Sequence, residues 1–376
     1  MSSTPSATTS GAATYDPFIR GRFPVGVRTL QAHDPTRQRL FPVEVWYPAA
    51  DRHTGQDTAA QTQDVFVATD GVRRPQLAVR DAGARPGTYP LVVFSHSSLG
   101  HRRAATFLCT HLSSHGYLVA ALDHSESIAP ELALGDDTGP QRDTRLAGWI
   151  TSRVPDVRFL LDHLLDNGGW GSPAAPDAGR VGIVGHSFGG WTALAAAGVE
   201  PRIRSVVALA PAGTANPRPG VIPVPLAFAR DRAVPTLYLA ADQDTPLPLA
   251  DIREQFDRTP PPKQLVILNR ADHWHFADDV ETAHEAFRTG PVTGEAAWIP
   301  AAMRPITELC SGAQAHLFVR GLTVAHLDAT LGQDNNAARL LAGDLVAELA
   351  ARGVEVTRDT EEAAVHRGHP SFPPTA

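Results

Sequence analysis

A serine at the centre of the run G-H-S-F-G is the residue best placed to act as a nucleophile. Ser187 follows the apolar run V-G-I-V and precedes an alanine-rich segment, so a buried strand leads in and a helix leads out. This strand, sharp turn and helix form a nucleophile elbow, which strains the backbone of the serine and exposes its hydroxyl at a sheet edge. Gly185 and Gly189 must lack side chains so that helix and strand can approach each other. A serine that only caps a buried helix is the structural alternative, and the flanking pattern favours the nucleophile.

A general base is expected downstream, because a serine hydroxyl is a weak nucleophile at neutral pH. The apolar run Q-L-V-I-L at 264–268 is followed by N-R-A-D-H-W-H-F-A-D, which holds two candidate histidines. His273 lies closer to the end of the predicted strand and is the favoured base. His275 is the alternative base, and we expect it instead to lie at the substrate rim or to support the base, with Trp274 also at the rim.

The orienting carboxylate is expected after the preceding strand. The segment T-L-Y-L-A-A-D-Q-D-T-P supplies both Asp242 and Asp244. Asp244 is favoured because the Thr-Pro turn that follows it gives a fixed position, whereas Asp242 is expected to cap or hydrogen-bond that turn. The chain order serine, aspartate, histidine is that of the α/β-hydrolases. The carboxylate would hold the imidazole in one tautomer and stabilise the imidazolium.

Two backbone N–H groups are expected to bind the oxyanion that forms when the serine attacks a carbonyl. One belongs to Phe188, which follows the nucleophile at the start of the helix. The other is expected in the turn after the strand P-L-V-V-F, where the chain reads S-H-S-S-L-G. By position this donor is Ser98, with Ser97 as the less favoured choice. A plain loop between strand and helix is the structural alternative.

Strand-like and helix-like segments alternate along the chain, which predicts an α/β-hydrolase fold with a mostly parallel central sheet flanked by helices. Short continuous apolar runs such as L-V-V-F indicate strands buried on both faces. The first two strands are predicted to be antiparallel and joined by the turn around Asp34–Gln38. The predicted strands are Val25–Ala32, Phe41–Tyr47, Leu91–Ser95, Tyr117–Asp123, Val181–Gly185, Ser205–Leu209, Thr236–Ala240 and Gln264–Leu268.

Three helices are predicted from spacing and end signals. Apolar residues at helical spacing indicate one that begins at Pro155 and stops at Gly168, and residues 188–198 form a second. The third begins at the capping residue Asp334 and closes at Gly353.

The domain organisation is predicted to be one hydrolase domain, residues 17–356, between mobile tails at 1–16 and 357–376 that are polar and rich in Pro, Gly, Ser and Thr. Segments 51–89, 211–233 and 288–312 fit neither strand nor helix well and are expected to be excursions around the sheet. The last two lie where a substrate rim could form, with Trp298 as a rim candidate.

Composition excludes several classes of protein. The net charge of -7 and pI near 6.1 argue against a nucleic-acid surface. No signal peptide and no apolar run long enough for integral membrane association is apparent. Two cysteines, Cys109 and Cys310, are too few for a disulfide framework, so the cytoplasm is the expected location. The oligomeric state is not readable from the sequence.

Short segments in three regions of the chain resemble the platelet-activating-factor acetylhydrolases. F-S-H-S-S-L-G and the later S-H-G-Y resemble the acetylhydrolase F-S-H-G-L-G and S-H-G-F, and G-H-S-F-G-G is identical to the acetylhydrolase elbow. H-W-H-F-A-D resembles the acetylhydrolase H-x-x-F-A-D, which independently selects His273. The likeness spans residues 20–330 in outline, and bacterial proteins described as predicted dienelactone hydrolases share it.

The resemblance has departures. The acetylhydrolase acid matches Ala210 here, which cannot serve, whereas A-A-D-Q-D-T-P-L-P resembles G-A-D-L-D-T-I-A-P of bacterial cutinases and related polyester hydrolases, whose acid matches Asp244. Ser97 stands where the acetylhydrolases have glycine. Ser187 departs from dienelactone hydrolases proper, which use a cysteine.

Together these patterns predict a serine esterase that forms an acyl-enzyme on small or lipid-like esters. No metal or organic cofactor is expected, because H-E-x-x-H, paired cysteines and a phosphate loop are all missing from the sequence. A thioesterase, an amidase or an acyltransferase would use the same residues, because the rim and the exclusion of water select the acceptor. A catalytically silent binding protein that keeps the pocket is the alternative of another class.

Overall fold

A ten-stranded sheet organises the chain. The computed structural model describes residues 15–68, 70–98, 100–124, 140–165, 170–225 and 232–359. The strand order is β12-β11-β10-β9-β8-β6-β7-β2-β1-β5, with a separate two-stranded sheet, β3-β4. The strands are β1 (Val25–Asp34), β2 (Arg39–Pro48), β3 (Asp64–Val67), β4 (Arg73–Gln76), β5 (Val79–Arg80), β6 (Gly87–Ser95), β7 (Leu118–Leu122), β8 (Ala174–His186), β9 (Ile203–Leu209), β10 (Thr236–Ala241), β11 (Lys263–Leu268) and β12 (Val356–Asp359).

Six neighbouring strands, from β7 to β11 in the sheet order, run parallel to one another. Their apolar runs are buried along nearly their whole length, as in the fully buried β7 and β10, because helices cover both faces of the sheet. β1 and β2 pair antiparallel, as predicted, and β2 pairs antiparallel with β7. The predicted α/β-hydrolase architecture is confirmed, and each predicted strand is present.

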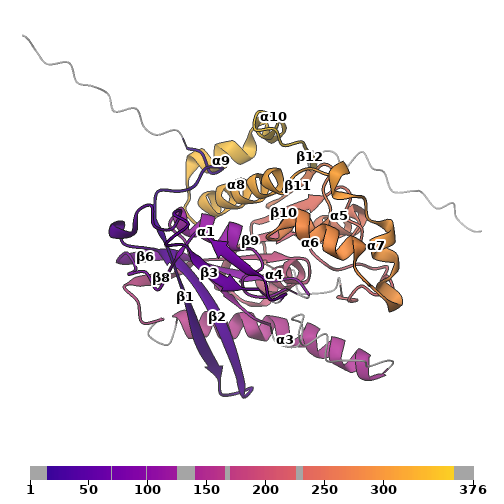
Figure 1. Ribbon diagram of the computed structural model, residues 1–376, viewed down its shortest axis with the longest axis horizontal. Coiled ribbons are helices and arrows are strands. Elements are labelled where there is room, and N and C mark those ends of the chain that lie inside the picture. The colour runs from indigo at the N-terminus through magenta and orange to yellow at the C-terminus, as the bar shows by residue number, and fades with distance from the viewer. Residues whose placement is uncertain are drawn as a thin grey trace, which may run out of the picture.

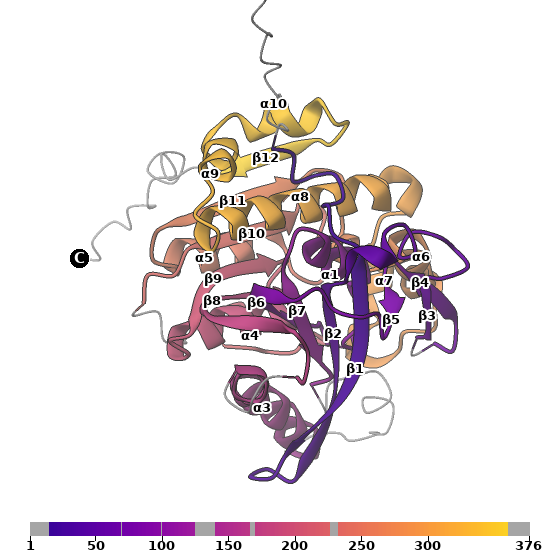
Figure 2. The same ribbon diagram turned by 90° about the vertical axis from the view of Figure 1, so that its left-hand side faces the viewer.

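Helices form a layer on each side of this sheet (Figures 1 and 2). On one face α3 packs against α4, and α4 contacts β6, β8 and β9; on the other, α1 and α8 lie side by side. The α-helices are α1 (Thr106–Ser114), α3 (Pro140–Leu165), α4 (Phe188–Val199), α5 (Leu249–Arg258), α6 (Val280–Thr289), α7 (Trp298–Ala302), α8 (Gly312–Thr330), α9 (Asn335–Ala342) and α10 (Leu345–Ala350). Short 3-10 turns are η1 (Asp51–His53), η2 (His273–Phe276), η3 (Gly294–Ala296) and η4 (Ile306–Glu308).

The order in which successive strands are added to the sheet reverses at β6, although β6, β7 and β8 all run parallel. β7 lies on one side of β6, and β8 and the later strands follow on the other side. In open α/β sheets a ligand crevice forms at such a reversal, outside the carboxyl ends of the strands. The loops that follow β6, β8, β10 and β11 all emerge at this edge, and they carry the residues that the sequence singles out.

Two predicted helix boundaries were wrong. α3 begins at Pro140, and Pro155 lies inside it. A proline inside a helix removes one hydrogen bond, but here buried side chains on both sides of it, Trp149 and Val157 among them, pack the helix onto the domain. The predicted stop at Gly168 lies outside the described residues. Near the C-terminus, two helices replace the single predicted helix. α9 ends before Gly343, and α10 begins after Asp344, which caps it by accepting the Ala347 N–H.

The ends of the chain and the expected excursions also differ in part from the predictions. Residues 357–359, expected in a mobile tail, belong to β12, which pairs antiparallel with β11. Tyr15 donates a hydrogen bond to Asp328 and Asp16 accepts the Phe18 N–H, while residues 1–14 and 360–376 of the expected tails lie outside the described residues. Segment 51–89 contains β3, β4, β5 and the start of β6, and segment 288–312 contains α7 and two 3-10 turns. No helix in the described part of the chain has the length and apolarity that a membrane crossing requires.

Candidate active site

Ser187 occupies a strained turn between β8 and α4. Its φ of 58° and ψ of −117° lie in a backbone region that residues other than glycine rarely adopt. The surrounding backbone holds this conformation: the Ser187 N–H donates to the Leu209 carbonyl at 2.9 Å, and its carbonyl accepts from Trp191 and Ala212. The serine is therefore held at the end of β8 in the manner of a nucleophile elbow.

The glycines on either side of Ser187 are required by close packing. A Cβ on Gly185 would lie 2.0 Å from the Gly189 carbonyl oxygen, and a Cβ on Gly189 would lie 1.9 Å from the Ser95 carbonyl oxygen. Both separations are far inside van der Waals contact, so neither position accepts a side chain without movement of backbone. The second contact also seats the elbow directly on the end of β6.

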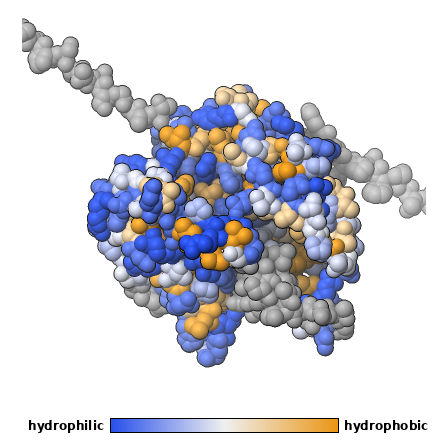
Figure 3. Space-filling view, in the orientation of Figure 1, coloured by the Kyte–Doolittle hydropathy of each residue, from blue (hydrophilic) through white to orange (hydrophobic). Residues whose placement is uncertain are grey.

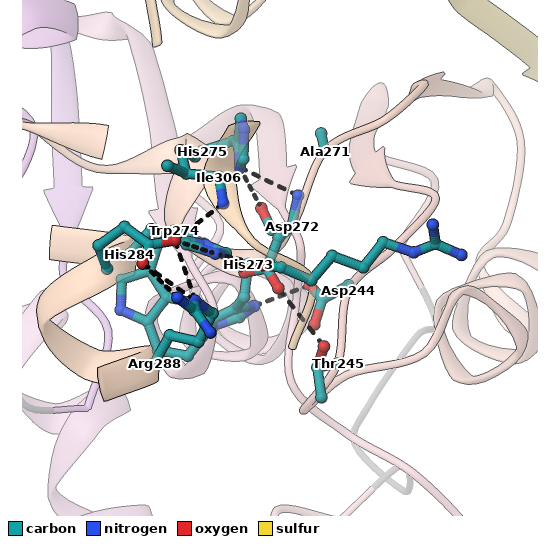
Figure 4. A network of polar contacts seen from close by, with 12 residues as sticks. Asp244, Thr245, Ala271, Asp272, His273, Trp274, His275, His284, Arg288 and Ile306 are labelled. Atoms are coloured by element: carbon teal, nitrogen blue, oxygen red, sulfur yellow. Dashed lines mark hydrogen bonds and ion pairs between the residues drawn. The ribbon is translucent and has the colours of Figure 1, made fainter. Parts of the chain in front are cut away.

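The imidazole of His273 is hydrogen-bonded to the carboxylate of Asp244, as Figure 4 shows. His273 Nδ1 and Asp244 Oδ2 are 2.8 Å apart. The other carboxylate oxygen accepts the Leu247 N–H at 2.8 Å, so the Asp244 side chain is fixed from two sides and fully buried. The structure thus brings together the two residues that the sequence predicts as base and acid.

The alternative residues have other partners. Asp242 accepts hydrogen bonds from the Ala271 N–H and the Gln243 side chain, tying the two loops together rather than facing the imidazole. His275, expected at the rim, is fully buried. One of its ring nitrogens lies 3.0 Å from the Cys310 carbonyl and the other accepts the Asp272 N–H, so it supports the loop from the interior.

The loop of the base is fixed by local hydrogen bonds. Asp272 caps η2, accepting the Trp274 N–H, and the His275 ring completes a capping box. Behind the serine, His186 contacts the carbonyl of His273 at 3.1 Å. Burial alone would lower the pKa of His273, but the carboxylates of Asp244 and Asp272 outweigh burial and raise this pKa above its usual value.

Ser98 and Phe188, whose backbone N–H groups are the predicted oxyanion donors, line the same cavity as Ser187. Neither N–H donates to a described residue, which leaves both available to a ligand oxygen. The Ser187 hydroxyl likewise makes no hydrogen bond within the described residues, as is common in catalytic sites without substrate.

The cavity at the serine has a volume of about 590 Å³, within the range of small-molecule sites. Trp274, expected at the rim, lines it, whereas Trp298 lines a separate, more polar hollow beside Asp244 and donates to the Pro219 carbonyl. Apolar side chains from several segments contribute to the wall, among them Phe66, Val221, Ile222, Leu247, Trp274 and Phe287.

The two arginines that line the cavity are already paired with carboxylates, and Asp278 accepts hydrogen bonds from Thr106 and Phe107. Arg74 forms ion pairs with Asp70 and Asp279, and Arg103 pairs with the buried Glu44 at 2.9 Å. Arg103 also lies over the ring of Phe66. An incoming ligand therefore meets mainly apolar surface and arginines whose charge is already paired.

The β3–β4 hairpin is the part of the wall that sequence reasoning missed. β3 alternates between buried and exposed residues, with Phe66 turned inward and Val65 and Val67 exposed. The short run V-F-V, whose residue types favour a strand, was the available signal, but the Pro and Gly around it favoured an irregular excursion. Figure 3 shows that this face is mostly hydrophilic, with small apolar groups, some of them over the hairpin.

Comparison with known proteins places this geometry in a known class. A family model described as Chlorophyllase matches residues 54–218. A solved structure described as a ferulic acid esterase from Streptomyces cinnamoneus superposes with a TM-score of 0.64 at 25% identity, covering 90% of this chain and 97% of that one. The chain is an α/β-hydrolase.

Curated relatives of this α/β-hydrolase agree with its predicted resemblance. Cutinase est1 from Thermobifida alba is 26% identical over 190 residues, 50% of this chain and 54% of the cutinase. A putative carboxymethylenebutenolidase from Yersinia pestis is 25% identical over 240 residues, 61% of this chain and 86% of that protein. Platelet-activating factor acetylhydrolases are also similar.

These names confirm the predicted resemblance and the coarse enzyme class, an esterase-type hydrolase. The match spans about half the length of the cutinase. The comparisons assign neither substrate nor catalytic residues to this chain.

Proposed function

We propose that this α/β-hydrolase is a serine carboxylic-ester hydrolase that works through an acyl-enzyme, with Ser187 as nucleophile, His273 as general base and Asp244 as the orienting acid. The observation that carries the proposal is the 2.8 Å contact between His273 Nδ1 and Asp244 Oδ2, at a cavity that also holds Ser187 in its strained turn. With Nδ1–H donating to the carboxylate, Nε2 of His273 is left as the basic nitrogen.

The reaction proceeds in two steps. His273 Nε2 takes the proton of Ser187 as its Oγ attacks the ester carbonyl, and the N–H groups of Ser98 and Phe188 bind the oxyanion. His273 then gives the proton to the leaving alcohol, and an acyl group remains on Ser187. Water, deprotonated by the same imidazole, releases the acid and restores the enzyme.

The substrate class follows from the wall of the cavity. Apolar side chains and arginines that are already paired favour an uncharged ester with an apolar acyl or aryl part, small or lipid-like, that fits a volume of about 590 Å³. The similarity to a ferulic acid esterase supports including aryl esters among the candidates.

The test uses Ser187→Ala with a series of p-nitrophenyl esters of increasing acyl length and with an aryl ester. We expect kcat to fall by roughly 10⁵-fold and a fluorophosphonate probe to label the wild-type protein but not the variant. Ser113→Ala is the matched control, because Ser113 is buried in α1 outside the cavity. Activity of Ser187→Ala within tenfold of wild type would reject the proposal.

Adding a second acceptor separates the related chemistries. With a competing alcohol present, a hydrolase yields mainly the free acid, whereas an acyltransferase yields mainly the new ester. Parallel assays with a thioester and an anilide of the same acyl group rank thioesterase and amidase activity against ester hydrolysis.

A further inference from the structure

One buried cation contacts both segments that carry the proposed oxyanion donors. Arg153, on α3, has no exposed surface. Its Nη1 donates to the carbonyl of His96 at 2.7 Å, two residues before Ser98. Its guanidinium carbon also lies 4.1 Å from the ring centroid of Phe188, which is cation–π distance. The same side chain thus joins the turn after β6 to the first residue of α4.

The turn after β6 is held from behind by the ring of His96. His96 Nε2 accepts the His124 N–H at 3.0 Å, so Nδ1 carries the proton and donates to the Ser97 carbonyl at 2.7 Å. The Ser97 carbonyl and the Ser98 N–H belong to one planar trans peptide, in which they point in opposite directions. Holding that carbonyl on the His96 ring therefore sets the direction of the Ser98 N–H.

The charge of Arg153 persists at neutral pH. Burial lowers the pKa of this guanidinium to about 9, opposed by the nearby Asp156. Asp156 itself contacts His124 at 3.0 Å, and Arg37 at 2.6 Å. A charged, buried guanidinium is therefore in contact both with the turn after β6 and with the ring of Phe188.

We propose that Arg153 is the positioning residue of the oxyanion hole, which holds the turn that carries Ser98 and the first residue of α4, Phe188, in fixed positions relative to each other. This inference rests on the proposed serine-esterase function. Substitution of Arg153 should therefore impair the charged transition state and leave binding of the neutral ester largely intact.

The test compares Arg153→Met and Arg153→Lys with the wild-type protein on the best p-nitrophenyl ester. We expect Arg153→Met to lower kcat by about 10²-fold, the effect of losing one oxyanion donor, with KM changed by less than about threefold. Affinity for a trifluoromethyl ketone, which forms a charged tetrahedral adduct with the serine, should fall by a similar factor. Arg153→Lys should recover part of both losses.

Arg232→Met is the matched control. Arg232 also holds several backbone carbonyls, those of Ala197, Glu200, Pro201 and Ile203, but it does not line the cavity. We expect it to lower the unfolding temperature without changing kcat per folded molecule, which is measured by titration with a fluorophosphonate.

The outcomes separate the two proposals. If the wild-type protein is labelled at Ser187 and Arg153→Met and Arg153→Lys keep the wild-type kcat per labelled site, the role of Arg153 is rejected and the esterase proposal stands. Equal losses of kcat in Arg153→Met and Arg232→Met also reject it, because a general structural effect would then suffice. If the wild-type protein is neither labelled nor active, both proposals fail.

Discussion

The two sides of the Ser187 cavity are built in different ways. On the base side, the loops after β10 and β11 are held by hydrogen bonds between residues that are close together in the chain: Asp244 accepts the Leu247 N–H, and Asp272 caps the 3-10 turn η2 that follows it. On the oxyanion side, the turn after β6 depends on Arg153, 57 residues away on α3. One side works through side chains fixed locally, and the other through backbone N–H groups fixed from a distance.

This difference has a physical origin. An imidazole needs a carboxylate in one position, which a short loop with its own caps can supply. A backbone N–H has no side chain to aim it, so its direction depends on what holds the neighbouring carbonyl. The two sides should therefore respond differently to the same kind of substitution.

The largest effect is expected on the base side. Asp244→Asn should lower kcat by roughly 10⁴-fold, because an amide favours the wrong imidazole tautomer. Asp242→Asn, in the neighbouring position, should leave kcat within about tenfold and mainly weaken the bond to the Ala271 N–H. Steady-state kinetics measures kcat of both variants. A larger loss of kcat in Asp242→Asn than in Asp244→Asn would assign the role of the acid to Asp242.

The oxyanion side should respond to backbone rather than side-chain changes. Ser98→Pro removes the N–H and should lower kcat by roughly 10²- to 10³-fold. Ser98→Ala keeps the N–H and should stay within about threefold of wild type. Steady-state kinetics measures kcat of both variants, and their unfolding temperatures check that they are folded. A large loss of kcat in Ser98→Ala would show that the Ser98 hydroxyl, rather than its backbone N–H, contributes to the reaction.

The contact between the elbow and the end of β6 is expected to have no room for a larger side chain. Gly189→Ala places a Cβ against the Ser95 carbonyl and should cost about 3 kcal/mol of unfolding free energy. Gly148→Ala is the control, because a Cβ there meets nothing within 4 Å in helix α3; it should stabilise by about 0.5–1 kcal/mol. Chemical denaturation compares the two, and equal stabilities would show that the elbow can relax.

The smallest expected effect is a displaced pH profile. Because Asp244 and Asp272 raise the pKa of His273, and the base must be neutral, kcat/KM should rise with pH through a value above that of free histidine. In Asp244→Asn the residual activity should reach its plateau at lower pH. The raised pKa also adds stability that is fully present below the pKa of the unfolded chain and lost as pH rises through the folded value. The unfolding temperatures of the wild-type protein and Asp244→Asn should therefore converge at high pH. If the pH profile of kcat/KM were the same in both proteins, the assignment of Asp244 as the partner of His273 would be contradicted.

Much of the fold was predictable because its signals are local. Continuous apolar runs marked the central strands, and G-H-S-F-G between a strand and a small-residue helix marked the elbow. Pro155 misled because its effect on a helix depends on burial of residues such as Trp149. β12 was missed because a four-residue edge strand carries no apolar run and is stabilised by its pairing with β11.

The sequence by itself determined the α/β class, the candidate serine and the short lists of histidines and aspartates, since spacing, glycines and chain order are properties of the chain alone. Only the tertiary structure decided that Asp244 rather than Asp242 contacts His273, that His275 is buried and that Phe66 reaches the cavity. It alone also brought Arg153 to the turn after β6. Distances between residues far apart in the chain are set by how the layers pack, and no local pattern encodes them.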